Sequence, residues 1–351
     1  MAKNIKNAVQ VLRDMGKIDT KILEVSPASI RMALGIIKSG GLVAFPTETV
    51  YGLGASALNA EAVSKIYKVK GRPSDNPLIV HVSNMLMVSK MTDYIPDYAW
   101  ELIRVFWPGA LTLVFRKKKN CPFRTNLKTV AVRMPKNDTA AKIIRKSNIP
   151  LAAPSANISG RPSPTKASHV YEDLNGKIEL ILDGGACELG LESTVVDVSG
   201  RVPVLLRPGS ITLESLQLFV SDIHVSNYQN DTLKPASPGM KYTHYAPKAK
   251  VTIVLGDKDK VVSKIYSLAS DMPQNKVGIL TMGDACAYNF ENIMSLGKDR
   301  EHIAANLFDA LRKCDKLNLD FVYAEGLNEE GLGLAIMNRL KKAAGYNIIN
   351  V

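Results

Sequence analysis

The chain has 351 residues, of which 46% are hydrophobic and 22% charged, and its formal net charge is +12 at pH 7. This length favours two domains, and the large apolar fraction excludes an intrinsically disordered chain. No apolar run approaches the roughly 18 residues that a membrane span needs, and the basic N-terminal segment lacks the apolar core of a signal peptide, so we predict a cytosolic protein.

The first 225 residues are predicted to form a short extension followed by one α/β domain. Residues 1–25 make up the N-terminal extension, in which Ile5, Val9 and Leu12 have the spacing of a short amphipathic helix. From residue 26 to residue 225, apolar runs typical of buried strands alternate with helical patterns, which predicts an α/β domain built on one large sheet. Helices are predicted over 26–39 and 60–69, and strands over 42–45, 78–82, 110–116, 130–133, 150–153, 178–182 and 194–198.

A linker and a second domain follow. Residues 226–250 contain several Pro, Gly, Asn and Ser and little apolar periodicity, which indicates an irregular linker. Strands are then predicted over 251–255, 277–281 and 321–324, and helices over 257–270, 301–316 and about 333–344. This alternation predicts a small doubly wound, Rossmann-like α/β domain over residues 251–351.

The excess of positive over negative charge comes entirely from the first part of the chain. Residues 251–351 contain 12 Lys and Arg against 13 Asp and Glu, whereas residues 1–250 contain the remaining 33 basic and 20 acidic residues. This distribution favours an anionic partner for the first part, such as a phosphate, a nucleotide or RNA. Charge alone also allows a basic surface that only keeps the protein in solution.

Polar loops follow several predicted strands of the first domain. The most unusual are residues 45–54 (FPTETVYGLG), 68–77 (KVKGRPSDNP) and 150–163 (PLAAPSANISGRPS), with shorter ones at 191–194 and 205–209. Because an open α/β sheet binds its ligands where its strands end, these loops are expected to converge on one site. Their lysines supply point charges and their arginines bidentate forks, and both suit a polyphosphate. Each loop alone also fits a structural or solvated turn, and the lone His81 also fits a core residue.

The sequence has no conventional nucleophile or metal motif. It contains no G-x-S-x-G, no catalytic-cysteine signature, no H-E-x-x-H and no G-x-x-x-x-G-K-S/T. The four cysteines lie far apart and without Cys-x-x-Cys spacing, which fits neither a zinc site nor a disulfide framework. The chemistry is therefore expected to depend on positioning and charge neutralisation, as in phosphoryl or nucleotidyl transfer.

Several motifs together resemble a known family. FPTETVYGLG, KVKGRPSDNPLIVHV, VAVRMP, PLAAPSANISGRPSPT, LESTVVDV and LLRPGSIT occur in this order, and they resemble the YrdC-type catalytic domain of threonylcarbamoyl-AMP synthases. SPGMKYTHYAP and the trailing α/β unit resemble the linker and accessory domain of the family's long form. The resemblance implies a YrdC-type twisted open sheet and a nucleotidyltransferase that converts L-threonine, bicarbonate and ATP to threonylcarbamoyl-AMP and pyrophosphate. The product would serve threonylcarbamoyladenosine modification of tRNA beside the anticodon, so tRNA and downstream tRNA-modification proteins are expected partners.

The resemblance also implies roles for individual residues. Lys70 and Arg72 would be catalytic, and Tyr242, His244 and Tyr245 would form a lid over the site. The implied ATP-binding residues are Arg72, Asn76, Thr129, Ser155, Asn157, Ser163, Arg207 and Tyr245. The implied threonine-binding residues are Thr49, His81, Arg133, Ala153 and Ser193, with Arg133 pairing the carboxylate. Mg²⁺ would arrive with ATP and bind mainly through phosphates and water, because the motifs offer no carboxylate cage.

Two other functions stay open from the sequence. The basic first part also suits an RNA-binding module that grips duplex or tRNA backbone without catalysis, although the chain lacks the aromatic and basic interleaving of common RNA-binding domains. A related carbamoyl-adenylate-forming enzyme that uses carbamoyl phosphate is the other alternative. Enzymes of that kind carry acylphosphatase and zinc-finger segments, and this sequence has neither.

Overall fold

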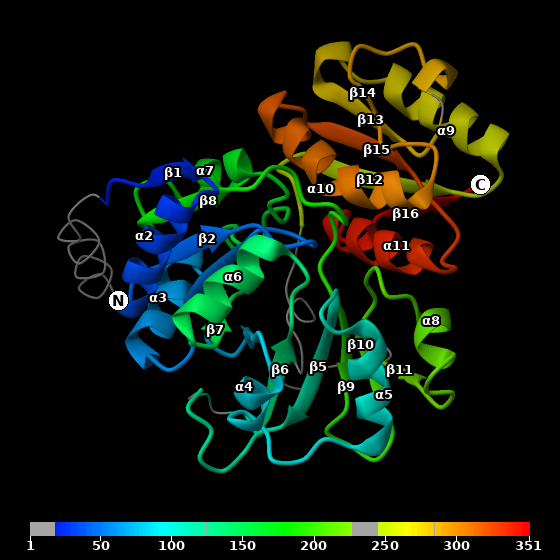
Figure 1. Cartoon of the computed structure of the whole chain (residues 1–351). Helices are drawn as coiled ribbons and strands as arrows, with labels where there is room; N and C mark the ends of the chain where they lie inside the picture. The colour runs from blue at the N-terminus through cyan, green and yellow to red at the C-terminus, as the bar shows by residue number, and fades with distance from the viewer. Residues whose placement is uncertain (1–17, 124, 126, 227–244, 284) are drawn as a thin grey trace, which may run out of the picture.

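The structure is a computed structural model that describes residues 18–123, 125, 127–226, 245–283 and 285–351. Within these residues the chain forms two sheets, one from residues 21–225 and one from residues 250–350, each packed against helices (Figure 1). No helix in this part of the chain is both long and apolar enough to cross a membrane.

The first sheet is open and mixed. Its strands are β1 (Lys21–Glu24), β2 (Val43–Phe45), β3 (Gly52–Ser56), β4 (Ile79–His81), β5 (Leu111–Arg116), β6 (Thr129–Arg133), β7 (Leu151–Ala152), β8 (Leu180–Asp183), β9 (Thr194–Asp197), β10 (Val204–Arg207) and β11 (His224–Val225). They lie in the order β1-β8-β2-β3-β7-β4-β6-β5-β9-β10-β11. Parallel and antiparallel neighbours alternate irregularly, since β2 runs parallel to β8 but antiparallel to β3.

Seven helices accompany this sheet in the described residues, and local signals define their ends. They are α2 (Pro27–Lys38), α3 (Ala60–Lys70), α4 (Met85–Ser89), α5 (Asp97–Phe106), α6 (Asp138–Ser147), α7 (Ala167–Leu174) and α8 (Leu213–Gln217). Asn59 caps α3 by accepting from the backbone N–H groups of Glu61 and Ala62. Gly71 ends α3 in the left-handed conformation with φ 59°, which turns the chain sharply after Lys70.

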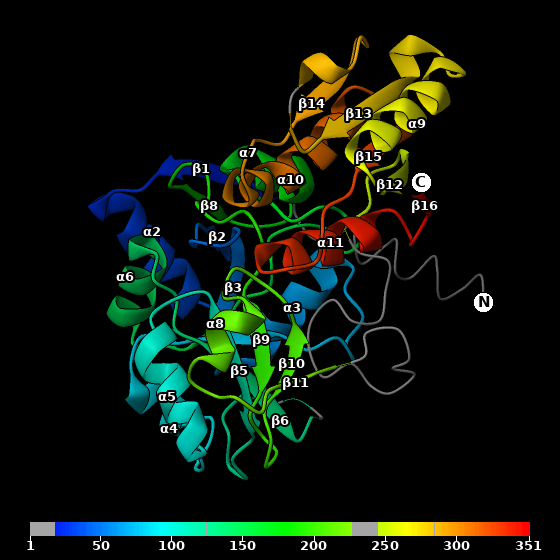
Figure 2. The same cartoon turned by 90° about the vertical axis from the view of Figure 1, so that its right-hand side faces the viewer.

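The second sheet is parallel throughout. Its strands are β12 (Lys250–Leu255), β13 (Val277–Thr281), β14 (Ile293–Ser295), β15 (Phe321–Glu325) and β16 (Ile348–Asn350), in the order β14-β13-β15-β12-β16. Its helices are α9 (Lys258–Ser270), α10 (Arg300–Lys316) and α11 (Leu332–Ala343), with short 3₁₀ turns η1 (Gln274–Lys276) and η2 (Ala285–Ala287). Helices α10 and α11 face the first sheet's part of the molecule, and α9 covers the other side (Figures 1 and 2).

The two parts share a hydrophobic cluster. Val50 and Leu191 of the first part pack with Tyr245 and with buried side chains of α10 and α11. Next to this cluster, Gly190 has φ +68°, and a Cβ there would lie 2.3 Å from Cα of Ala305 in α10. Only glycine therefore lets α10 approach this loop so closely.

The predicted α/β class and Rossmann-like second unit are confirmed, and the differences are local. Residues 21–24, which we placed in the extension, form β1 and pair with β8, because a short and mostly exposed edge strand has little apolar signal. The predicted loop over 45–54 contains the start of β3, which is a buried strand. Its two glycines lack the apolar side chains that would have predicted a strand here. The predicted strand over 150–153 shrinks to Leu151–Ala152 between Pro150 and Pro154. The expected N-terminal helix and most of the linker lie outside the described residues.

Candidate active site

A cavity opens where several elements of the first sheet end. Its walls come from the ends of β2, β4, β6, β7 and β10, from the loop after α3 and from Tyr245. Of the residues that the sequence predicts to bind ATP or threonine, those that line it are Thr49, Lys70, Arg72, His81, Arg133, Ala153, Ser155, Asn157, Ser163, Ser193, Arg207 and Tyr245. The expected convergence of the polar loops on one site is therefore present.

Lys70 holds the turn that carries Ser155 and Asn157. Its Nζ donates to the Ser155 carbonyl at 2.6 Å and, at shorter range, to the Asn157 carbonyl. The Ser155 hydroxyl in turn donates to Asn157 Oδ1 at 2.6 Å. Burial, and then the nearby Arg72 charge, hold the pKa of Lys70 well below its usual value. The remaining contact of Nζ, to Asn157 Oδ1, is long at 3.5 Å, so a phosphate could replace it without displacing either carbonyl.

Arg72 is fixed by the loop that follows it. Its Nε donates to the Asn76 carbonyl at 3.2 Å, and its Nη2 donates to Asn76 Oδ1 at 2.6 Å and to the Pro77 carbonyl at 2.8 Å. Nη1 makes no hydrogen bond to the part of the chain that the structure describes, and Arg72 lines the cavity. Burial lowers its pKa to about 10, which leaves the guanidinium charged at neutral pH.

Arg207 and Ser193 touch each other inside the cavity. Arg207 donates from Nη2 to the Ser193 carbonyl at 2.9 Å and to Ser193 Oγ at 3.2 Å. The Ser193 hydroxyl also shares a hydrogen bond of 2.7 Å with the hydroxyl of Thr112 on β5. A predicted ATP ligand and a predicted threonine ligand are thus direct neighbours.

Arg133 is held from three sides at the end of β6. Its Nε donates to the Gly109 carbonyl at 3.1 Å, its Nη1 donates to Thr49 Oγ1 at 2.8 Å, and its Nη2 lies 2.8 Å from Glu48 Oε1. Burial raises the pKa of Glu48, but the Arg133 charge and the N–H groups of Lys136 and Asn137 outweigh it and lower the pKa to about 2. Arg133 therefore presents a fixed cation beside a permanently ionised carboxylate.

His81 is a neutral, buried imidazole in the same wall. Burial, and then the charge of Arg133, lower its pKa to about 3. Its Nδ1 is buried and has no hydrogen-bond partner within the described residues. A buried polar atom of this kind is costly unless a ligand satisfies it.

Sequence reasoning missed Glu192 as a cavity residue. Its Oε1 accepts from the Ser163 hydroxyl at 2.5 Å, its Oε2 accepts from Arg339 Nε at 3.0 Å, and the Tyr245 phenol also bonds to it. Burial raises its pKa, but Arg339 and Arg207 outweigh that effect and lower the pKa to about 2. The available signal was an acidic residue directly before a buried strand in LESTVVDV. The cavity also includes Thr47 and Ser159, which the motifs contained but we did not select.

Two of the predicted residues that the structure describes, Asn76 and Thr129, do not line the cavity. Asn76 contacts Arg72 instead of the open space. Thr129 lies at the far end of β6 from Arg133, about 13 Å away at 3.3 Å per residue, and lines a separate, smaller pocket with Pro77 and Leu78. Tyr242 and His244 lie outside the described residues, and of the expected lid only Tyr245 is described, buried against Phe308 at 5.1 Å between ring centroids.

Glu192 in the cavity wall and Glu48 beside the cavity are both already held by arginines. Glu48 is paired with Arg133 and Glu192 with Arg339. The residues that the structure describes contain no group of three or more His, Cys, Asp and Glu side chains that could hold a metal ion.

Known proteins are similar to the chain along most of its length. Residues 35–209 match a family model described as "Telomere recombination", and residues 211–345 match a model described as "Threonylcarbamoyl-AMP synthase, C-terminal domain". The threonylcarbamoyl-AMP synthase of Pyrococcus abyssi is 50% identical over 328 residues, which cover 92% of this chain and 96% of that protein. The Bacillus subtilis synthase is 46% identical over 337 residues, covering 94% and 97%.

A solved structure is similar in fold as well. The crystal structure of P. abyssi Sua5 complexed with L-threonine superposes with a TM-score of 0.89 at 48% identity. The match covers 95% of this chain and 99% of the other, so both sheets and their relative placement are included.

Proposed function

Because the chain belongs to the threonylcarbamoyl-AMP synthase family, we propose that its cavity is where L-threonine, bicarbonate and ATP become threonylcarbamoyl-AMP and pyrophosphate. The observation that supports this proposal is the direct contact of Arg207, a predicted ATP ligand, with Ser193, a predicted threonine ligand. Family membership favours this enzyme over the RNA-binding module.

ATP binds, in this proposal, at the side of the cavity with Lys70, Arg72 and Arg207. Arg72 can offer Nη1 to a phosphate oxygen without breaking its bonds to the loop. The turn of Ser155 and Asn157 supplies a closely approachable backbone. Three cations on one side neutralise the charge that develops on pyrophosphate as it leaves. Mg²⁺ enters with the phosphates of ATP, since Glu192 in the cavity wall and Glu48 beside the cavity are already paired with arginines.

L-Threonine binds at the side with Thr49, His81, Arg133 and Ser193. The guanidinium of Arg133 pairs with its carboxylate, and because Glu48 and Gly109 already hold Arg133, little further side-chain ordering is needed. His81 Nδ1, neutral and unpartnered, accepts a hydrogen bond from the amine or the hydroxyl. The solved relative with L-threonine supports an amino-acid subsite of this kind.

The reaction then needs no protein nucleophile. The unprotonated amine of threonine attacks carbon dioxide and then loses a proton, or it attacks bicarbonate, from which water leaves; a carbamate forms in either case. A carbamate oxygen attacks the α-phosphorus of ATP, the bond between the α-phosphorus and its bridging oxygen breaks, and pyrophosphate leaves with the electron pair. The cavity contributes alignment of the two reactants, which lowers the entropic part of the barrier, and positive charge.

The product suits the tRNA modification that the family serves, and tRNA and bicarbonate remain proposed partners. A cytosolic location stays a prediction from the sequence. Salt dependence distinguishes the alternative: an RNA-binding module loses affinity steeply as salt rises, whereas ATP and threonine stabilise a synthase at constant salt.

The decisive experiment measures pyrophosphate release by the purified protein. We expect release from ATP only when threonine and bicarbonate are both present. A matched pair of variants on α3 checks the site: Lys70→Met abolishes release, and Lys68→Met, which removes an exposed lysine two residues away, leaves it unchanged. Pyrophosphate release at the same rate without threonine refutes the proposed function.

A further inference from the structure

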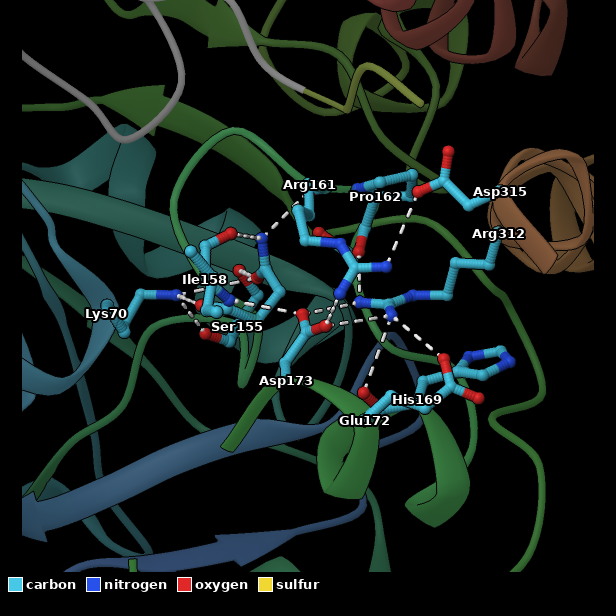
Figure 3. A network of polar contacts seen from close by, with 12 residues as sticks. Lys70, Ser155, Ile158, Arg161, Pro162, His169, Glu172, Asp173, Arg312 and Asp315 are labelled. Carbon is cyan, nitrogen blue, oxygen red and sulfur yellow. Dashed lines mark hydrogen bonds and ion pairs between the residues drawn. The ribbon is translucent and has the colours of Figure 1, made fainter. Parts of the chain in front are cut away.

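The second sheet's helix α10 reaches the first part of the molecule through Arg312. This arginine is 1% exposed, and its Nη2 donates to Asp173 Oδ2 on α7 at 2.9 Å and to the Pro162 carbonyl at 2.6 Å (Figure 3). Asp173 also accepts from the backbone N–H of Ile158 at 3.2 Å and from Arg161. Helix α10 is thereby fastened to the loop that runs along the cavity between residues 155 and 163.

Lys70 and Asp173 hold the loop of residues 155–163 by hydrogen bonds from opposite sides. Lys70 holds its first turn from within the cavity, and Asp173 holds the next residue, Ile158, from outside (Figure 3). The loop ends at Ser163, whose hydroxyl donates to Glu192. The position of Ser163 therefore depends on what holds Glu192.

Glu192 is held by a second arginine, from helix α11. Arg339 is 0% exposed, and it donates from Nε to Glu192 Oε2 at 3.0 Å, from Nη2 to the Glu192 carbonyl at 3.3 Å and from Nη1 to the Pro208 carbonyl at 2.5 Å. Pro208 directly follows Arg207, so Arg339 contacts both the segment that contains Glu192 and the segment that contains Arg207.

The charge balance of this wall makes Arg339 necessary. Glu192 is 7% exposed and lines the cavity together with Arg207, beside which the proposed function places the ATP phosphates. An unpaired carboxylate there would repel a polyphosphate, and like charges in a desolvated site are costly. With Arg339 in place, the same carboxylate becomes a neutralised acceptor for Ser163 and Tyr245.

We propose that Arg339 of α11 is a positioning residue for ATP: it neutralises Glu192 and so keeps Ser163 and Tyr245 in place on the nucleotide side of the cavity. The inference rests on the proposed placement of ATP. It assigns the C-terminal part of the chain a direct share in shaping the catalytic cavity, through a side chain that does not touch the substrate.

Calorimetric titration of the full chain with Mg·ATP and, separately, with L-threonine tests this role. Arg339→Met should weaken ATP binding about tenfold or more and leave threonine binding within about twofold, because Arg133 and Thr49 are held by each other, by Glu48 and by Gly109 rather than by Arg339. Adding Glu192→Gln to Arg339→Met should restore most of the lost ATP affinity, since the unpaired charge is removed. Lys341→Met is the matched control on α11, where Lys341 pairs only with Glu329, and it should bind both ligands as wild type does.

The outcomes separate a positioning role from a merely structural one. Equal weakening of ATP and threonine binding, ATP binding within twofold of wild type, or no rescue by Glu192→Gln overturns the inference. If Arg339→Met does not fold, the double variant provides the test, because it removes both charges of the Arg339–Glu192 pair: near-normal ATP affinity supports the role, and a tenfold loss overturns it. Arg72→Ala checks the placement of ATP independently, and normal ATP binding by that variant refutes the placement rather than the role of Arg339.

Discussion

Glu48→Gln should destabilise the protein in a manner that depends on pH. Glu48 is 7% exposed, and its carboxylate lies 2.8 Å from Arg133, whose side chain is 4% exposed. The pKa of Glu48 falls from 4.5 to about 2 on folding, which corresponds to about 3 kcal/mol of stability at pH 7. Because the folded-state pKa is lowered, this stability is present above pH 4.5 and is lost as the pH falls toward 2. By the same linkage it amounts to about 2 kcal/mol at pH 3.5.

The assay is urea unfolding followed by tryptophan fluorescence at several pH values between 7 and 3.5. Both tryptophans, Trp100 and Trp107, lie in the first part of the chain with Glu48, so the signal reports on the right region. Glu101→Gln is the control, because it breaks an exposed ion pair with Arg104 that is worth about 1 kcal/mol or less. A loss below about 1 kcal/mol for Glu48→Gln at pH 7, or a loss that stays constant down to pH 3.5, would show that the pair does not stabilise the fold in this way.

Three further outcomes follow from the cavity and its surroundings. Thr49→Val removes the acceptor of Arg133 Nη1 and should raise KM for threonine about tenfold with KM for ATP unchanged; a parallel rise of both contradicts the assignment. The pKa of His81 is about 3 in the folded protein, so near pH 6 the imidazole takes up a proton only in the unfolded state, and the free energy of unfolding decreases as the pH decreases. His81→Gln should therefore remove about 1 kcal/mol of the stability lost between pH 7 and pH 5.5, as measured by urea unfolding. Gly190→Ala forces a Cβ to 2.3 Å from Ala305 and should lower Tm by several degrees, and an unchanged Tm argues against the close approach of α10.

Much of the fold could be predicted because its signals are local. The helix over 26–39 has its cap and its apolar stripe in the sequence, and it appears as Pro27–Lys38. Short strands escaped prediction where they lie at an edge, as β1 and β11 do, or contain two glycines in five residues, as β3 does. In such strands the apolar alternation that marks a half-buried strand is weak or missing.

The cavity was predictable from its loops, and its outer support was not. Arg72 and Ser155 lie in conspicuous motifs, and the structure brings them to one space. Arg339 is 147 residues from Glu192 and belongs to an ordinary amphipathic pattern, so no local feature links the two. The one hint is an arginine on the buried face of that pattern, since such a residue needs a partner from elsewhere in the chain.

The shared hydrophobic cluster has a consequence for how the molecule comes apart. Val50 and Leu191 belong to the chain's first part but are buried among side chains of α10 and α11, and Arg312 and Arg339 cross the same boundary. Separating the two parts would expose apolar surface and leave buried carboxylates without their counter-charges, so the separation of two folded parts costs free energy and should not precede unfolding. Heating should accordingly produce one cooperative transition with both parts melting together, although the chain contains two sheets with separate topologies.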